Sequence, residues 1–293
     1  MSSRHSVLIT GASSGFGHLT ALTLAERGHR VYASMRDMTG RNADASARLL
    51  EKASQKGWDL HTVELDVTDD ASIAAAVERV LVLGDLDVVI NNAGATSSGL
   101  LESFTAEQVE SVVRLNALGA VRVNRAVLPH LRSRGEGLLV HVTSGSGRMV
   151  LPYFGPYTAA KFALEAIAET YRYELRPLGI DSVIVEPAAY ATELGSNALR
   201  AEDAAYVAEY GETGTRLRSV LAALSETPES VDGPGPQEVV DAIVALVEAE
   251  TGQRPLRTAV GATVKPLLNH INQATADKQR EALTLMGLAD LTG

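Results

Sequence analysis

The sequence predicts an α/β fold, with a doubly wound, parallel, seven-stranded sheet that has helices on both faces and a helical insertion late in the chain. Three observations predict it. Short apolar runs alternate with longer helical stretches, some runs such as Val88-Val89-Ile90 are apolar throughout, and a glycine-rich turn follows the first run. Strands that are apolar on both faces need helices above and below them, which βαβ units supply.

The elements follow one another regularly along most of the chain. The expected strands cover residues 7–9, 30–34, 60–65, 86–90, 137–143, 180–186 and 256–260. The expected helices cover residues 17–27, 43–55, 70–83, 105–132, 157–176, 237–249 and 264–286. No internal repeat or low-complexity tract interrupts this order.

The alternation lapses between about residues 192 and 237. Helices near residues 202–210 and 215–225 precede a run, 227–236, that is rich in helix-breaking residues. A linker to a second domain and an insertion into one domain both fit this stretch. Because a further helix and strand follow and complete the sheet, we expect one domain over residues 1–293 with an insertion at about 193–236.

Composition excludes several classes of function. The formal net charge of −10 argues against a general nucleic-acid binder, which needs surplus Lys and Arg. The chain has no cysteine, so disulfides, thiolate metal sites and a cysteine nucleophile are excluded, and no H-E-x-x-H or Cys/His cluster predicts a metal site. No apolar run is long enough for a membrane span and no signal peptide is evident, so we expect a cytoplasmic protein without membrane contact.

The glycine-rich turn has the spacing G-x-x-x-G-x-G between a strand and a helix. Glycines at such a turn let backbone N–H groups approach a pyrophosphate at the helix N-terminus. The expected contact residues are Gly11, Ser13, Ser14, Gly15, Phe16 and Gly17. The same segment also fits G-x-S-x-G, the nucleophile elbow of serine hydrolases, with Ser13 as the nucleophile. That elbow normally follows a strand deep in the sheet and not the first strand of the chain.

Three motifs in order give the sequence a strong resemblance to the short-chain dehydrogenase/reductase family, whose fold is Rossmann-like. Thr10 to Gly17 matches its T-G-x-x-x-G-x-G, Asn91-Asn92-Ala93-Gly94 matches its N-N-A-G, and Tyr157-Thr158-Ala159-Ala160-Lys161 matches its Y-x-x-x-K. The resemblance covers residues 5–192 motif by motif, and the rest in architecture only. The details look most like the steroid and retinol dehydrogenase-like branch.

The resemblance implies four catalytic residues. Tyr157 would be the acid/base, and Lys161, four positions later on the same helix face, would lower its pKa and bind the nicotinamide ribose. Ser144 matches the serine that hydrogen-bonds the substrate oxygen, and Ser146 sits off the family spacing. Asn116 matches the helix asparagine that holds a water near the lysine.

The cofactor expectation is NADP(H). In NAD-binding relatives an acidic residue follows the second strand, but here Met35 occupies that place and Arg36 follows it. An arginine can pair with a 2′-phosphate, although Asp37 could instead pair with Arg36. Ser13 lies where similar NADP-preferring proteins contact that phosphate.

Further contacts with the cofactor follow from the resemblance. Asp66 and Val67 resemble the adenine-contacting pair, although Asp66 is also a good N-cap for the next helix. Asn92, Ala93 and Gly94 would line the adenosine side of the pocket, and Pro187, Tyr190 and Thr192 its other end. The family usually has P-G-x-x-x-T where this chain has Pro187-Ala188, so Ala188 would be strained if the backbone needs a positive φ there.

The expected function is an NADP(H)-dependent interconversion of a secondary alcohol and a ketone. The insertion and the loop 150–154 are mainly apolar, which favours an apolar or aromatic carbonyl substrate. A non-catalytic NADP(H)-binding regulator and the Ser13 hydrolase are the alternatives. The resemblance implies a homodimer or homotetramer formed through the helices at 105–132 and 157–176.

Overall fold

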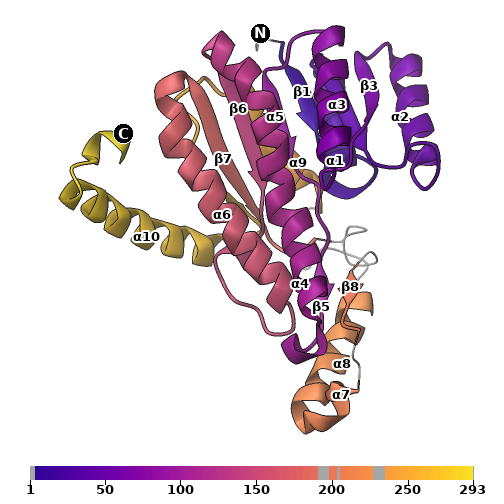
Figure 1. Cartoon of the computed structure of the whole chain (residues 1–293), viewed down its shortest axis with the longest axis vertical. Coiled ribbons are helices and arrows are strands. Elements are labelled where there is room, and N and C mark those ends of the chain that lie inside the picture. The colour runs from indigo at the N-terminus through magenta and orange to yellow at the C-terminus, as the bar shows by residue number, and fades with distance from the viewer. Residues whose placement is uncertain (1–3, 191–197, 203–204, 227–234, 293) are drawn as a thin grey trace.

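A computed structural model describes residues 4–190, 198–202, 205–226 and 235–292. Its main feature is a seven-stranded parallel sheet with the strand order β3-β2-β1-β4-β6-β7-β9 (Figure 1). The strands are β1 (Ser6–Ile9), β2 (Arg30–Met35), β3 (Leu60–Glu64), β4 (Val88–Asn91), β6 (Gly137–Val142), β7 (Ile180–Pro187) and β9 (Arg257–Val260). The order reverses direction between β1 and β4, which confirms the doubly wound sheet that the sequence predicts.

Helices cover both faces of the sheet. On one face lie α1 (Gly15–Glu26), α2 (Ala43–Lys56) and α9 (Gln237–Glu248), whose apolar residues join one buried cluster. On the other face lie α3 (Asp70–Leu83), α5 (Gly119–Arg134) and α6 (Gly155–Leu175), which contribute to a second cluster. Both faces of the sheet are therefore shielded from water by helices, which explains why the strands are apolar on both sides.

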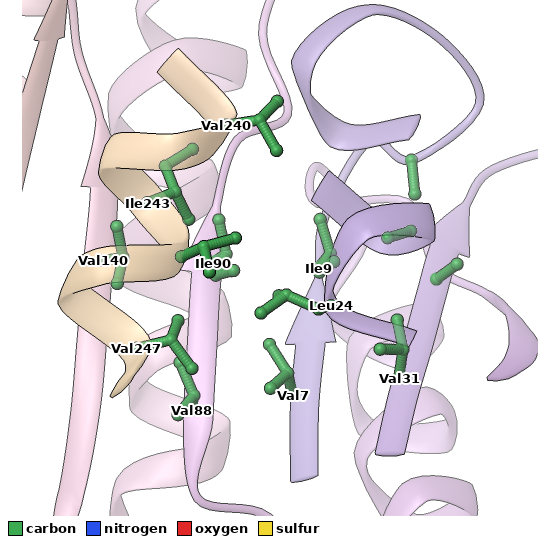
Figure 2. Packing of buried hydrophobic residues seen from close by; sticks show 14 of the residues in the cluster. Val7, Ile9, Leu24, Val31, Val88, Ile90, Val140, Val240, Ile243 and Val247 are labelled. Carbon is green, nitrogen blue, oxygen red and sulfur yellow. The ribbon is translucent and has the colours of Figure 1, made fainter. Parts of the chain in front are cut away.

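In the first cluster, strand residues of one sheet face pack against the two helices α1 and α9 (Figure 2). Ile90 of β4 and Val140 of β6 lie under Ile243 of α9, while Leu24 of α1 lies beside Ile9 of β1. All five side chains are fully buried. Because α1 and α9 are held against the sheet in this way, the turn that begins α1 has a fixed position.

The region expected as one helix over 105–132 is divided. It consists of α4 (Ala106–Val113), a π-helical turn (Arg114–Leu118) and α5. The capping box that begins α4, with Thr105 and Gln108 bonded to each other's backbone, fits the predicted start. A π-helical turn inserts one extra residue into the helix and is frequent at functional sites.

The insertion forms structure of its own. A short strand, β5 (Ser97–Ser98), pairs in parallel with β8 (Leu199–Arg200), and this second small sheet was not predicted. The helices α7 (Tyr206–Glu209) and α8 (Gly211–Glu226) follow and lie beyond α4 at one end of the molecule (Figure 1). After the insertion the chain returns to the main sheet, where β9 pairs with β7 in parallel.

The C-terminal helix α10 (Lys265–Leu285) extends away from the body of the fold (Figure 1). Leu268, near its start, is the side chain that it buries among the described residues. Farther along, Asn272 donates a hydrogen bond to Glu186 of β7 (2.7 Å), and Thr275 accepts one from Arg148 (2.8 Å). Polar contacts therefore hold the first half of this helix. Short 3₁₀ turns at Leu101–Ser103, Gly145–Gly147, Arg176–Leu178 and Ala289–Thr292 complete the structure.

Candidate active site

The sequence-predicted site residues gather at the carboxyl ends of the central strands. Ile9 and Ile90 pair in the register of β1 and β4, the two strands between which the strand order reverses. In open α/β sheets the crevice outside the strand ends at such a switch point is the usual ligand site. The glycine-rich turn, the Asn-Asn-Ala-Gly segment and the end of β6 all follow these strand ends.

The glycine-rich turn needs its glycines for two different reasons. Gly11 and Gly15 have φ values of +69° and +54°, a region that side chains disfavour. Gly17 has no room for a side chain, because a Cβ there would lie 2.4 Å from the carbonyl oxygen of Gly11 and 2.5 Å from the Asn92 amide nitrogen. The first turn of α1 is thereby packed directly against the loop after β4.

Asn92 and Thr10 connect this turn to the Asn-Asn-Ala-Gly segment. The Asn92 side-chain amide donates to the carbonyl oxygens of Thr10 (2.9 Å) and Gly11 (3.1 Å). The Thr10 hydroxyl in turn accepts from the backbone N–H groups of Asn92 and Ala93, both at 3.0 Å. Asn92 and Ala93 thus fix the glycine-rich turn, and Gly94 is the next residue of the same segment.

The start of α1 fits a phosphate group. Ser14 is its N-cap residue, yet no side-chain hydrogen bond caps the helix there. Ser13, Ser14, Gly15 and Phe16 are all partly exposed around this point. Uncapped N–H groups at a helix N-terminus attract an anion, so the expected pyrophosphate contacts suit this structure.

Arg36 lies on an organised turn at the end of β2. Its side chain is exposed, and its carbonyl oxygen accepts a hydrogen bond from the Asn42 amide (2.6 Å). The carboxylate of Asp37 accepts from the backbone N–H of Arg41 (2.8 Å), and Arg36 and Asp37 form no ion pair within the described part of the chain. The competing pairing considered from the sequence is therefore not found.

Asp66 lies at the end of β3 and does not cap the next helix. Its Oδ1 accepts from the N–H (2.8 Å) and the hydroxyl (2.7 Å) of Thr68, whereas Asp69 is the N-cap of α3. Partial burial acts against the charged form of Asp66, but the Thr68 hydrogen bonds together with the charges of Arg36 and Arg114 outweigh it and lower the pKa of the carboxyl. Val67 is buried against the position of Gly119.

Ser144, Tyr157 and Lys161 come together beyond the end of β6. Ser144 follows that strand, and its Oγ accepts the backbone N–H of Ser146 (3.1 Å), which leaves the Ser144 hydroxyl proton free to be donated elsewhere. Tyr157 and Lys161 lie on the first turns of α6, and the phenol of Tyr157 shares a hydrogen bond with Ser144. Ser144 is the serine that bonds to Tyr157, whereas Ser146 contributes its backbone N–H to Ser144.

Burial controls the pKa values of this pair. Burial raises the pKa of Tyr157 to about 12, and the Ser144 hydrogen bond only partly opposes it. Burial also lowers the pKa of Lys161 to about 8. The Lys161 Nζ lies 5.6 Å from the Tyr157 ring centroid and donates to the carbonyl oxygen of Val142 (2.9 Å). Desolvation of the phenol is therefore the main cause of the raised tyrosine pKa in this structure, and the lowering of that pKa by the ammonium group stays a prediction.

Asn116 lies in the π-helical turn and bonds to backbone on two sides. Its amide nitrogen donates to the carbonyl oxygens of Ala95 (2.9 Å) and Val112 (3.0 Å), and its Oδ1 accepts from the N–H of Ala95 (3.2 Å). A Cβ on Gly94 would lie 2.6 Å from Asn116 Oδ1 and 3.8 Å from Lys161 Nζ. Asn116 and Lys161 therefore both border Gly94.

The segment after β7 is not strained at Ala188. The described non-glycine residues with positive φ are Asp37 and Tyr153, so alanine is tolerated where the family usually has glycine. The backbone N–H of Ala188 donates to the carbonyl oxygen of Val260 (2.9 Å), which continues the backbone pairing between β7 and β9. Pro187 ends the strand.

Tyr190 closes the end of the site that lies beside α1. Its ring meets Phe16 edge-on at 5.8 Å between centroids, and its hydroxyl donates to Glu238 of α9 (2.8 Å). Tyr190 thereby links the glycine-rich turn to α9. Thr192, expected to contact the cofactor, lies outside the described residues.

Sequence reasoning missed Ser97 and Glu165 near the site, and it placed Tyr153 in the loop 150–154 without its unusual backbone. Ser97 Oγ accepts the backbone N–H of Tyr157 (3.1 Å) and so helps to fix the start of α6. Tyr153 has a φ of +71°, an uncommon backbone state for a side chain of its size, in the loop before Tyr157. Glu165 is buried one helical turn after Lys161, a spacing visible in the sequence. The described residues contain no group of three side chains suited to hold a metal ion.

Comparisons with known proteins show which family this chain resembles in sequence. The sequence profile of the family described as short chain dehydrogenase matches residues 5–203. A 3-ketodihydrosphingosine reductase from Bacteroides thetaiotaomicron is 33% identical over 262 residues, 89% of each chain. Human (Homo sapiens) 17-beta-hydroxysteroid dehydrogenase type 1 is 40% identical over 248 residues, 83% of this chain and 74% of that one.

The fold has a matching counterpart among solved structures. A short-chain dehydrogenase from Streptomyces avermitilis superimposes with a TM-score of 0.76 at 30% identity, covering 96% of this chain and 98% of that one. No described helix combines the length and apolar character that a membrane crossing needs. The sequence motifs, the strand-end site and these relatives together lead to one conclusion: the chain belongs to the short-chain dehydrogenase/reductase family of oxidoreductases.

Proposed function

We propose that the protein is an NADP(H)-dependent oxidoreductase that interconverts a ketone and a secondary alcohol, with Tyr157 as the acid/base. The observation that carries the proposal is the convergence of Ser144, Tyr157 and Lys161, with Lys161 next to Gly94 after β4. A reacting carbonyl group placed there meets a hydroxyl donor, a phenol donor and a cation.

The nicotinamide cofactor has a set of fitting residues. Its pyrophosphate suits the uncapped start of α1, with Gly11, Ser13, Ser14, Gly15, Phe16 and Gly17 around it. Asp66 and Val67 would border the adenine, and Asn92, Ala93 and Gly94 the adenosine side. Arg36, exposed on its fixed turn, would hold a 2′-phosphate. When bound, the cofactor supplies or accepts the hydride, and the protein provides orientation and protons.

The protonation states favour carbonyl reduction near neutral pH. With a pKa of about 12, the phenol of Tyr157 is protonated at pH 7 and can donate its proton to the developing alkoxide. Ser144 has its oxygen oriented by the N–H of Ser146 and donates its own proton to the same substrate oxygen. Lys161, with a pKa of about 8, is charged at pH 7 and stabilises negative charge on either oxygen. Asn116, beside Gly94, would hold a water that returns a proton toward Lys161.

An apolar carbonyl compound fits the substrate side. Apolar side chains are exposed near the start of α6: Leu101, which borders Gly155, and Val150 and Leu151 of the preceding loop are all more than two-fifths exposed. The insertion at about 193–236 would act as a lid. Its described part contacts this region, since Tyr210 bonds to Glu102 (2.5 Å) and Tyr153 bonds to the Thr213 carbonyl (3.4 Å). Relatives whose names specify a steroid or a ketosphingoid base point to the same chemical class.

The decisive experiment replaces the phenol. Tyr157→Phe should lower NADPH-dependent reduction of a panel of apolar ketones by at least about a thousandfold, while NADPH still binds with a Kd within about threefold of wild type. The replacement removes only the hydroxyl, so the fold should be kept. Equal activity of the variant would overturn the proposal. Turnover by neither protein, with NADPH still bound, would instead favour the non-catalytic regulator.

A further inference from the structure

Glu165 is a buried carboxylate one helical turn after the proposed catalytic residue Lys161. It lies four residues after Lys161 on α6, so both side chains leave the same face of the helix. Its side chain is only 4% exposed. The turn that carries Ser144 packs onto it, because a Cβ on Gly147 would lie 2.9 Å from Glu165 Cγ.

The first oxygen of Glu165 fixes the residue before Ser144. Its Oε1 accepts the hydroxyl of Thr143 at 2.6 Å, a short and fully buried hydrogen bond. The Thr143 backbone N–H also bonds to the Val185 carbonyl (2.9 Å), so this end of β6 is held from the sheet and from α6. The direction in which Ser144 leaves the strand is set by these contacts.

The second oxygen of Glu165 is held by a cation on the sheet edge. Its Oε2 accepts from Arg257 Nε (3.0 Å), and Arg257 also binds Glu169 (2.6 Å). Both oxygens of Glu165 are therefore engaged and the carboxylate has one position. Burial raises the pKa of Glu165, and Arg257 and Thr143 oppose that rise.

The charge of Glu165 acts on Lys161. Burial lowers the pKa of Lys161, and the negative charge of Glu165 raises it. The other charged groups that face Glu165 come from each element packed against it: Glu169 on α6, Glu186 on β7, Arg257 on β9 and Arg148 after the turn at Gly145–Gly147. Among these charged groups, Glu165 is the one whose charge acts on Lys161.

We propose that Glu165 is a positioning residue for the reaction, acting through Thr143 on Ser144 and through its negative charge on the Lys161 ammonium group. This rests on the proposed reductase function. Glu165 touches neither the substrate nor the cofactor in this account. Its two effects are separable, because one depends on a hydrogen bond and the other on a charge.

The test compares three variants of the full-length protein in NADPH-dependent ketone reduction. Glu165→Gln should lower kcat by about tenfold or more and move the alkaline fall of the kcat–pH profile down by about one pH unit, because a neutral amide no longer supports the ammonium. Thr143→Val keeps the negative charge of Glu165 but removes its hydrogen bond to residue 143, so it should lower kcat without moving the alkaline fall of the kcat–pH profile. The matched control is Glu169→Gln. Glu169 lies one turn farther along α6 and pairs with the same arginine, Arg257, and this variant should have a kcat and a kcat–pH profile close to those of the wild type.

Two outcomes overturn the proposal. One is a Glu165→Gln variant that is folded and has the kcat and pH profile of Glu169→Gln. The other is a Thr143→Val variant with wild-type kcat, which decides the hydrogen-bond effect even if Glu165→Gln fails to fold. NADPH binding followed by its own fluorescence from pH 6 to 9 tests the charge effect without turnover. If no ketone is reduced by wild type, the reductase proposal fails, whereas a shifted binding profile in Glu165→Gln still supports the action on Lys161.

Discussion

At the scale of single residues, the chemistry depends on how deeply each group is buried. Tyr157 and Lys161 are both almost fully buried, and burial moves their pKa values in opposite directions, up for the phenol and down for the ammonium group. The pair therefore holds a neutral acid and a cation between about pH 6 and pH 8. That is the state needed to protonate a carbonyl oxygen as hydride arrives.

The pH dependence of reduction follows from these values. Between pH 6 and 7 kcat should be flat, because Tyr157 is protonated and Lys161 is charged. Above about pH 8 it should fall as the Lys161 ammonium loses its proton. Lys161→Arg keeps a positive charge throughout this range, so its residual activity should lose that fall near pH 8. A steady-state kcat–pH profile of both proteins checks this, and an unchanged fall in Lys161→Arg would assign it to another group.

Arg36 should decide between the two nicotinamide cofactors. Arg36→Ser should weaken NADPH binding by about 10- to 100-fold and leave NADH binding within about twofold, because only NADPH carries the 2′-phosphate. Arg48→Ser, an exposed arginine on α2, is the matched control and should change neither affinity. Fluorescence titration with both cofactors measures this. Equal loss for both cofactors would contradict the role given to Arg36.

At the scale of elements, the sequence predicted the regular parts and missed the local departures. Every strand and helix of the main sheet lies within a few residues of its predicted range, because the apolar runs and glycine breaks are local signals. The π-helical turn at Arg114–Leu118 has no such signal. It coincides with hydrogen bonds from Asn116 to Ala95, a residue distant in sequence. The small sheet of β5 and β8 likewise joins segments about a hundred residues apart.

The same distinction applies to the site. Its motif residues are recognisable in the sequence, but their pKa values are not, because burial is set by the whole fold. Glu165 was visible only as a spacing from Lys161. Its bonds to Thr143 and Arg257 join α6 to β6 and β9.

The close packing of the glycine-rich turn gives a prediction for one element, α1. Gly17→Ala places a methyl group at 2.4 Å from the Gly11 carbonyl oxygen, so the first turn of α1 must move away from Asn92. NADPH affinity should fall by more than tenfold, and Tm should fall by several degrees. Calorimetry and fluorescence titration check this together. A variant with wild-type affinity would show that the close approach of α1 is not needed for binding.

At the scale of the whole molecule, one arginine joins the last strand of the sheet to the neighbouring strand β7 and to helix α6. Arg257 of β9 lies within 3.5 Å of Glu165, Glu169 and Glu186, and all four side chains are nearly buried. Burial and the neighbouring Glu165 raise the pKa of Glu186 to about 7. The edge strand is therefore attached by charge as well as by its backbone pairing with β7.

Removing that arginine should destabilise the entire domain. Arg257→Met leaves buried carboxylates without their cation and should cost about 3–5 kcal/mol in the free energy of unfolding. The cost should shrink at pH 5, where protonation removes the unpaired charge. Arg27→Met breaks an exposed pair with Glu248 and is the matched control, with a much smaller cost in the free energy of unfolding. Urea unfolding at pH 5 and pH 8 measures both, and equal costs for the two variants would contradict this account.

The position of Arg257 in the chain has a consequence for synthesis. A ribosome completes Glu165, Glu169 and Glu186, together with six strands of the sheet, well before it adds β9. Until residue 257 leaves the exit tunnel, those carboxylates have no partner on the missing strand and must stay hydrated or take up protons. The growing chain therefore cannot bury the carboxylates of α6 and β7 as ion pairs before β9 is made. The final packing of the catalytic helix α6 waits for a segment made after the insertion.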